Sequence, residues 1–238
     1  MAVAIGDTHG ALESVYKSIE SNCCDCKGHD LFLLGDSQVG FNPENEKKYV
    51  WPRINSLLIS VNLILYIVRG NHDNPEWFDG KHNLSNIKFL EDYSIVKSYD
   101  FLGEPIKILV LGGGISINRS SNQLIPGKTW FKDEGFKLNK SFLNSVRDID
   151  IVISHNCPDF CHPKGLNMMI ESWTQSDPTI CHDITTERAE ITSAYNIIKK
   201  HNNLRRWYYG HMHQSLQYYH DDVEFTCVNI LDFKEMYK

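Results

Sequence analysis

Aspartate, asparagine and histidine residues recur in this sequence directly after short apolar runs. The runs end in Gly-Asp-Thr-His, Gly-Asp, Gly-Asn-His-Asp, Ser-His and Gly-His-Met-His. The positions concerned are Asp7, His9, Asp36, Asn71, His72, His155, His211 and His213. Carboxylate, amide and imidazole groups are common oxygen and nitrogen ligands of transition metals. The pattern therefore predicts metal-dependent chemistry.

The spacing within two of these motifs favours a shared target. Asp7 and His9 are two residues apart, as are His211 and His213. In an extended segment such residues point to the same side, so each pair can face one point. Two carboxylates, one amide and four imidazoles exceed what one ion needs, and they suit two ions about 3.5–4 Å apart that share a carboxylate. Nitrogen and oxygen ligands without thiolate favour Mn, Fe or Zn over Mg or Ca.

Each motif also has a purely structural explanation when it is taken alone. Gly-Asp is common in turns, His9 can cap a helix that starts near residue 10, and His155 can be a hydrogen-bonded core histidine. Arg69 and Arg119 can clamp a phosphate, or they can form surface salt bridges. The occurrence of five such motifs, in order, at five strand ends favours the functional interpretation.

The apolar runs predict strands that alternate with helices. Strands are expected at 2–5, 30–35, 63–68, 150–155 and 206–209, with two more around a Gly-Glu-Pro turn in 94–114 and a hairpin over 216–230 that turns at Asp221–Asp222. Helices are expected at 11–21, 45–60, 139–146 and 184–200, whereas 74–93 and 156–183 lack periodicity. This order predicts parallel strands with crossover helices. Ligands of such sheets bind beyond the carboxyl ends of the strands.

Composition is that of an ordinary globular protein, with 42% hydrophobic and 23% charged residues among 238. One domain is expected over 1–238, with 156–183 as a lid insertion. No apolar run approaches the roughly 18 residues of a membrane span, and the first ten residues do not read as a signal peptide. The net charge of −6 and the absence of a long basic cluster disfavour polymeric nucleic acid as a partner.

Cysteine usage points to a reducing compartment. Seven cysteines without a secretion signal are simplest to explain as free thiols in the cytoplasm. The stretch Cys-Cys-Asp-Cys-Lys-Gly-His at 23–29 could hold zinc, but no second cysteine pair follows at zinc-finger spacing. We therefore expect this cluster to be a coincidence.

In their order along the chain, from residue 6 to 213, the motifs resemble those of the calcineurin-like metallophosphoesterase superfamily. The resemblance implies an α/β fold, a four-layer α/β/β/α sandwich with two mixed sheets. It implies one metal bound by Asp7, His9, Asp36 and His213, and a second bound by Asp36, Asn71, His155 and His211. Asp36 would bridge the two ions together with a water or hydroxide that attacks the phosphate. His72 matches the family's general acid, which protonates the leaving oxygen.

One difference from the motifs of the superfamily narrows the range of expected functions. In the protein serine/threonine phosphatase branch the Gly-Asp motif leads to a further Asp-Arg, where this chain has Val39 and Gly40. The Gly-rich stretch that starts at 111 looks more like small stand-alone bacterial and phage-type phosphoesterases. What orients His72 is left open, with Asp73 as one candidate.

We therefore expect a phosphatase of small phosphate esters, with nucleotides favoured, that uses two transition-metal ions, manganese before iron or zinc. The residues assigned to catalysis are His72, Asn71 and Asp36, and those assigned to substrate binding are Asn71, Arg69 and Arg119. Trp173, in the lid segment, could stack on a base. The alternatives are a phosphodiesterase or nuclease and a catalytically idle interaction scaffold on the same fold. Intact ligand positions favour an enzyme.

Overall fold

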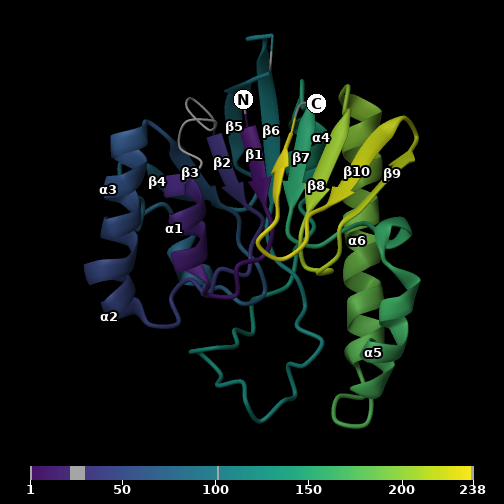
Figure 1. The fold of residues 1–238 in the computed structure, drawn as a ribbon. Coiled ribbons are helices and arrows are strands. Elements are labelled where there is room, and N and C mark those ends of the chain that lie inside the picture. Colours follow the sequence, from purple (N-terminus) through teal and green to yellow (C-terminus); the bar gives the residue numbers. More distant parts are fainter. Residues whose placement is uncertain (1, 22–29, 101, 237–238) are drawn as a thin grey trace.

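The computed structural model describes residues 2–21, 30–100 and 102–236, and it has two β-sheets stacked face to face (Figure 1). The cysteine-rich stretch at 23–29 lies outside the described residues. The first sheet has the strand order β11-β1-β2-β3-β4. Its members are β1 (Ala2–Ile5), β2 (Asp30–Leu33), β3 (Ile64–Ile67), β4 (Ile87–Phe89) and β11 (Phe233–Glu235). The first four are parallel, and β11 pairs antiparallel with β1.

The second sheet has the strand order β5-β6-β7-β8-β10-β9. Its members are β5 (Ile95–Tyr99), β6 (Pro105–Leu111), β7 (Ile151–Ser154), β8 (Arg206–Tyr209), β9 (Leu216–His220) and β10 (Val223–Cys227). The four central strands are parallel, and β5 and β9 pair antiparallel at the edges. Both sheets are therefore mixed, as expected.

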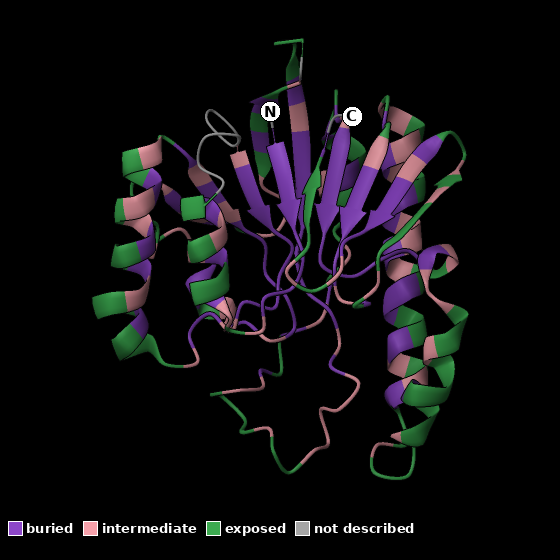
Figure 2. Cartoon of the chain, in the orientation of Figure 1, coloured by how far each residue is buried: buried purple, intermediate pink, exposed green. Residues whose placement is uncertain are grey.

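Alternation along each strand divides the apolar core into three layers. In β1, Val3 and Ile5 face the helices on the outside of the first sheet, whereas Ala2 and Ala4 face the second sheet. The layer between the sheets includes Phe32, Val110, Ile153 and Tyr208. Figure 2 shows that the central strands are buried along most of their length, whereas exposed residues lie on the outer faces of the helices, in loops and on β9 and β11.

Helices cover the outer face of each sheet. The first sheet carries α1 (Leu12–Ser21) and a run formed by α2 (Pro43–Asn45), the π-helical turn η1 (Glu46–Val50) and α3 (Trp51–Val61). The second sheet carries α4 (Lys140–Ser145) and α6 (Ile180–His201). This confirms the predicted four-layer α/β/β/α sandwich. No helix among the described residues combines the length and apolar composition that crossing a membrane requires.

Three expectations about individual elements are wrong. The segment 74–93 is not all loop, because it holds the 3₁₀ turn η2 (Pro75–Trp77) and the strand β4, which is too short to show a pattern. The strand β11 was not expected, because its three residues are exposed and show no apolar alternation. The segment 156–183 contains η3 (Asp159–Cys161), η4 (Lys164–Leu166), α5 (Asn167–Ser172) and the first turn of α6.

Candidate metal centre

The candidate ligands lie in loops that follow the parallel strands of both sheets, at one shared edge of the sandwich (Figure 1). Asp7, Asp36 and Asn71 follow β1, β2 and β3 of the first sheet. His155 follows β7, and His211 and His213 follow β8, both in the second sheet. Parallel strands place their carboxyl ends together, so residues up to 206 positions apart in the chain come together here.

Four of these side chains form a first cluster, made of Asp7, His9, Asp36 and His213. Each offers one donor atom, and these atoms all lie within 4.8 Å of one another. Nε2 of His9 lies 2.9 Å from Nε2 of His213. Nε2 of His213 lies 3.2 Å from Oδ2 of Asp7. The four donors thus surround one point.

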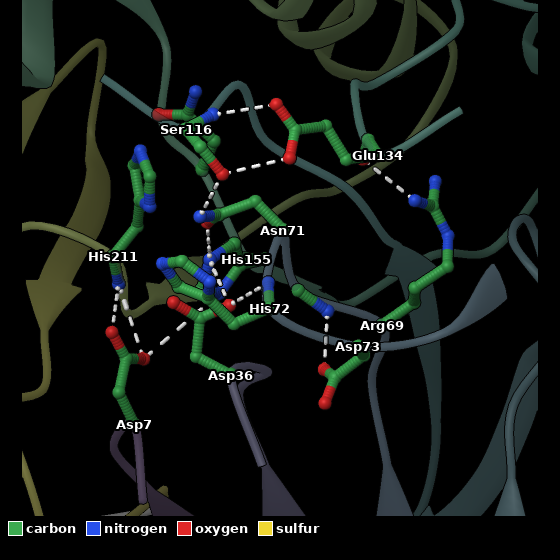
Figure 3. Close-up of polar contacts among 12 residues, drawn as sticks. Asp7, Asp36, Arg69, Asn71, His72, Asp73, Ser116, Glu134, His155 and His211 are labelled. Carbon is green, nitrogen blue, oxygen red and sulfur yellow. Dashed lines mark hydrogen bonds and ion pairs between the residues drawn. The ribbon is translucent and has the colours of Figure 1, made fainter. Parts of the chain in front are cut away.

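The second cluster joins Asp36, His155 and His211, with donor atoms again within 4.8 Å of one another. Nε2 of His155 lies 3.2 Å from Oδ1 of Asp36 and 2.7 Å from Oδ1 of Asn71. Figure 3 shows these side chains converging from loops of both sheets. Asp36 belongs to both clusters, as a bridging carboxylate requires.

The donor set fits two divalent transition-metal ions. With bonds of about 2.1 Å, neighbouring donors in an octahedral shell are separated by about 3.0 Å, and the separations above range from 2.7 to 3.2 Å. Asp7 and Asp36 are both 1% exposed. Carboxylates buried so deeply are stable only beside positive charge or hydrogen-bond donors. Seven residues would therefore hold the two ions: Asp7, His9, Asp36, Asn71, His155, His211 and His213.

Protons and metal ions would compete for the same imidazoles. Burial is the largest single influence on the pKa of His155 and lowers it, but the charge and hydrogen bond of Asp36, the charge of Asp7 and the carbonyl oxygen of Leu34 together raise this pKa to about 10. Burial, followed by the charge of His155, lowers the pKa of His211 well below its ordinary value. His211 is thus a neutral imidazole, the form that binds metals, whereas His155 must release a proton before it can coordinate one.

The backbone at the ligands is unusual. His9, Asp36, His211 and His213 have φ values of +44°, +49°, +62° and +51°. This left-handed region is uncommon for residues other than glycine and is found preferentially at functional sites. The loops that carry Asp36 and Gly70 also approach each other closely. A Cβ on Gly70 would lie 2.3 Å from the backbone nitrogen and from Oδ1 of Asp36.

A buried hydrogen-bond network fixes the orientation of Asn71 (Figure 3). Nδ2 of Asn71 donates to Oγ of Ser116 at 2.9 Å, and that hydroxyl donates to Oε2 of Glu134 at 2.7 Å. The backbone N–H of Ser116 donates to Oε1 of Glu134 at 2.9 Å. Because the serine hydroxyl donates its one hydrogen bond to the Glu134 carboxylate, its oxygen accepts from Asn71. The Asn71 oxygen therefore faces the second cluster.

Sequence reasoning missed Ser116 and Glu134. Both are buried, at 1% and 3% exposure, and burial raises the pKa of Glu134 to about 7. The available signal was the position of Ser116 just after the Gly-rich strand end, in a stretch that otherwise lacks regular structure.

The contacts of Asp73 show whether this residue orients the His72 ring. The Asp73 carboxylate accepts hydrogen bonds from the backbone N–H groups of Ser37, Val39 and Gly70, at 2.7–2.9 Å. Asp73 therefore ties the loop after β2 to the loop after β3, and it does not orient the His72 ring. His72 is half-buried, its backbone N–H donates to Oδ1 of Asp36 at 2.8 Å, and its ring lies edge-on to His9.

Neither arginine that we assigned to substrate binding is free to clamp a phosphate in this structure. Arg69 is 4% exposed; it pairs with Asp92 at 2.7 Å and donates to the carbonyl oxygen of Glu134 at 2.6 Å. Arg119 pairs with Asp177 and Asp183, each at 2.5 Å, and so joins the loop after β6 to the start of α6. The assignment is corrected because both guanidinium groups have carboxylate partners that are distant in sequence.

A cavity of about 500 Å³ opens onto the metal-binding edge. Its lining includes His9, Asp36, Asn71, His72, His211 and His213. Further lining comes mainly from 156–183 and α6, and it includes Leu166, Met169, Ile170, Trp173, Ile184 and Arg188. Arg188 was not singled out from the sequence, because a lone arginine in a helix carries no motif.

Comparisons with known proteins agree with this geometry. A family model described as calcineurin-like phosphoesterase matches residues 2–215. A search of curated proteins found no match.

Among solved structures, a dimetal phosphatase from Danio rerio has a TM-score of 0.58 at 12% identity, over 97% of this chain and 87% of that one. A candidate 5′-nucleotidase from Staphylococcus aureus, in complex with alpha-ketoglutarate, has a TM-score of 0.55 at 12% identity, over 96% of this chain and 48% of that one. This chain thus spans about half the length of the second protein. At such low identity, both likenesses concern the fold alone.

Proposed function

Because the chain belongs to the calcineurin-like phosphoesterase family, we propose that it hydrolyses phosphate esters of small molecules with two bound transition-metal ions, manganese foremost. The observation that carries the proposal is the pair of ligand clusters that share Asp36. Two ions bound there would lower the pKa of a coordinated water and polarise the phosphoryl oxygens.

The protein's own side chains would orient the ester and move one proton. Asn71, held by Ser116, presents its amide oxygen to the second cluster. His72 lines the cavity beside His9 and is not needed as a ligand, so it is available to protonate the leaving oxygen. The backbone N–H of His72 donates to Asp36, which keeps the acid next to the bridging carboxylate.

The cavity favours small substrates, including nucleotides. A volume of about 500 Å³ is within the range of small-molecule sites. Trp173 lies in its wall, where it could stack on a base. A net charge of −6 disfavours long polyanions, whose binding depends on many basic contacts. Location in the cytoplasm stays a prediction.

The alternative function on the same fold is that of a catalytically idle interaction scaffold. Convergence of every ligand-type side chain, with His72 intact in the cavity wall, supports the enzyme. A nuclease would be supported by a basic groove, whereas the side chains that line the cavity beside the metal-binding residues and His72 are mostly apolar.

The test is hydrolysis of p-nitrophenyl phosphate and bis-p-nitrophenyl phosphate by the purified chain, with and without Mn²⁺. We expect Mn²⁺-dependent release of p-nitrophenol, faster from the monoester, and loss of this activity in Asp36→Asn. Equal hydrolysis by the wild-type protein and Asp36→Asn would contradict the proposal. Nucleotides, phosphopeptides and single-stranded DNA are then compared by kcat/KM at matched salt, and preference for the DNA or the peptides by more than about tenfold would contradict the small-substrate proposal.

A further inference from the structure

The cavity that contains the metal-binding groups is also lined by a buried cation. Arg188 lies on α6, is 8% exposed and lines the cavity. Its Nε and Nη1 atoms are buried and make no hydrogen bond to any residue that the structure describes. A guanidinium group in this condition is unusual, because burying a charge without compensation is costly.

The carboxylates nearby compensate this charge poorly. Asp159 approaches Nε of Arg188 to 3.4 Å without hydrogen-bond geometry, and its side chain is 60% exposed. Because the Asp159 carboxylate is mostly exposed, solvent screens its attraction for the buried guanidinium group. Glu187 is the next residue on α6, but its oxygens accept from the backbone of Ile115 and Phe136 and from Asn156.

A neighbouring histidine adds to the polar character of this end of the cavity. Nε2 of His162 lies 3.0 Å from Oδ1 of Asn167, while Nδ1 is buried and has no hydrogen-bond partner in the part of the chain that the structure describes. Burial, followed by the charge of Arg188, lowers the pKa of His162. The imidazole is therefore neutral, and the positive charge in this part of the wall comes from Arg188.

Apolar side chains line the same cavity as Arg188 and the metal-binding groups. Leu166, Met169, Ile170 and Trp173 come from the segment around α5, and Ile117 and Ile184 add to this lining. A ligand that fills the cavity would thus meet metal-binding groups, apolar side chains and a buried cation.

We propose that Arg188 forms an anion subsite, so that preferred substrates are phosphate esters whose apolar or aromatic leaving group carries a second negative charge. This inference rests on the proposed function, since the scissile phosphate must lie at the metal cluster. The second anion can be a carboxylate or another phosphate, because a guanidinium group binds both.

The decisive experiment compares leaving groups that differ in charge. The wild-type protein with Mn²⁺ is assayed on 4-carboxyphenyl phosphate, 1,4-phenylene bisphosphate and the neutral 4-acetamidophenyl phosphate. We expect kcat/KM for the anionic esters to exceed that for the neutral ester by about tenfold, the effect of one charge-assisted contact. The two anionic esters show whether carboxylate or phosphate is the better ligand. Equal kcat/KM for all three esters would overturn the proposal.

Variants assign the effect to Arg188. In Arg188→Met the ratio of anionic to neutral kcat/KM should fall to about one, and Arg188→Lys should restore part of it. Arg205→Met is the matched control, because Arg205 precedes β8 at the opposite end of the strand and is 66% exposed. It should keep the wild-type ratio. A wild-type ratio in folded Arg188→Met would overturn the proposal, and the wild-type comparison still decides if that variant does not fold.

Binding without turnover separates this inference from the proposed function. Calorimetry with phenylphosphonate and 4-carboxyphenylphosphonate needs no hydrolysis. If no ester is hydrolysed, the proposed function fails, and tighter binding of the carboxylated phosphonate by about tenfold still supports the subsite. Equal binding of the two phosphonates overturns the subsite even in an active enzyme.

Discussion

Replacing Ser116 by alanine tests whether the network behind Asn71 controls the second ligand cluster. The substitution removes one hydroxyl that accepts from Nδ2 of Asn71 at 2.9 Å and donates to Glu134 at 2.7 Å. Both partners are buried, so water does not readily replace the lost contacts. A hydrogen bond to a charged group contributes about 1.5–3 kcal/mol, and unsatisfied buried groups add to the loss.

The expected effect falls on one of the two metal sites. Loss of a partner that orients a ligand typically weakens metal binding by about 10- to 100-fold, which corresponds to about 1.4–2.8 kcal/mol. This agrees with the value of the lost hydrogen bond. Asn71 is assigned to the second cluster only, so the cluster of Asp7, His9, Asp36 and His213 should keep its affinity.

The assay is a Mn²⁺ titration by calorimetry, with elemental analysis after dialysis. Ser98→Ala is the matched control: Ser98 is also buried and donates to a carboxylate, Oδ2 of Asp30 at 2.5 Å, at the amino end of β2. Two unchanged affinities in Ser116→Ala would refute the positioning role. Equal metal loss in both variants would show that lowered stability, rather than the orientation of Asn71, is the cause.

Three further outcomes follow from the described geometry. The purified, metal-loaded chain should hold two ions by elemental analysis, and Asp36→Asn should lose more metal than removal of any single histidine, because only Asp36 joins both clusters; one ion per chain would argue against this model. His72→Ala should lower kcat by about 10²–10⁴ with metal content kept, and the loss should shrink for esters with good leaving groups; a uniform loss would remove His72 from the acid role. Gly70→Ala should lower both metal content and melting temperature, because the new Cβ would lie 2.3 Å from Asp36 atoms, while Gly165→Ala, with nothing within 4 Å, should match the wild type in both measurements.

The metal ligands could be predicted because residue types that bind metals directly follow apolar runs that predict strands. Asp7, Asp36, Asn71 and His155 each follow an apolar run, and parallel strands place such residues together whatever their separation in the chain. The division of the strands into two sheets was anticipated through the resemblance to the superfamily rather than from the local pattern. Short strands such as β4 escaped prediction, because three residues are too few to show a period.

The residues that were missed or misassigned depend on tertiary contacts. Nothing near Arg119 in the sequence reveals that it pairs with Asp177 and Asp183, some 60 positions further on. Likewise, the roles inferred for Glu134 and Arg188 depend on residues that the fold brings near them from distant parts of the chain. The left-handed backbone at His9 and His213 is also set by the surrounding loops, since histidine itself does not require it.

The two ligand clusters each draw donors from both sheets, which links the metal centre to the thickness of the sandwich. Asp7 is carried by β1 of one sheet, and His213, 3.2 Å away, follows β8 of the other. The apolar side chains between the sheets, such as Ala4 and Tyr208, therefore act as a spacer that sets the separation of the donors. A bulkier residue at Ala4 would widen the gap without touching a ligand. The interior packing thus bears on the distance across which the two sheets hold the donors of each cluster.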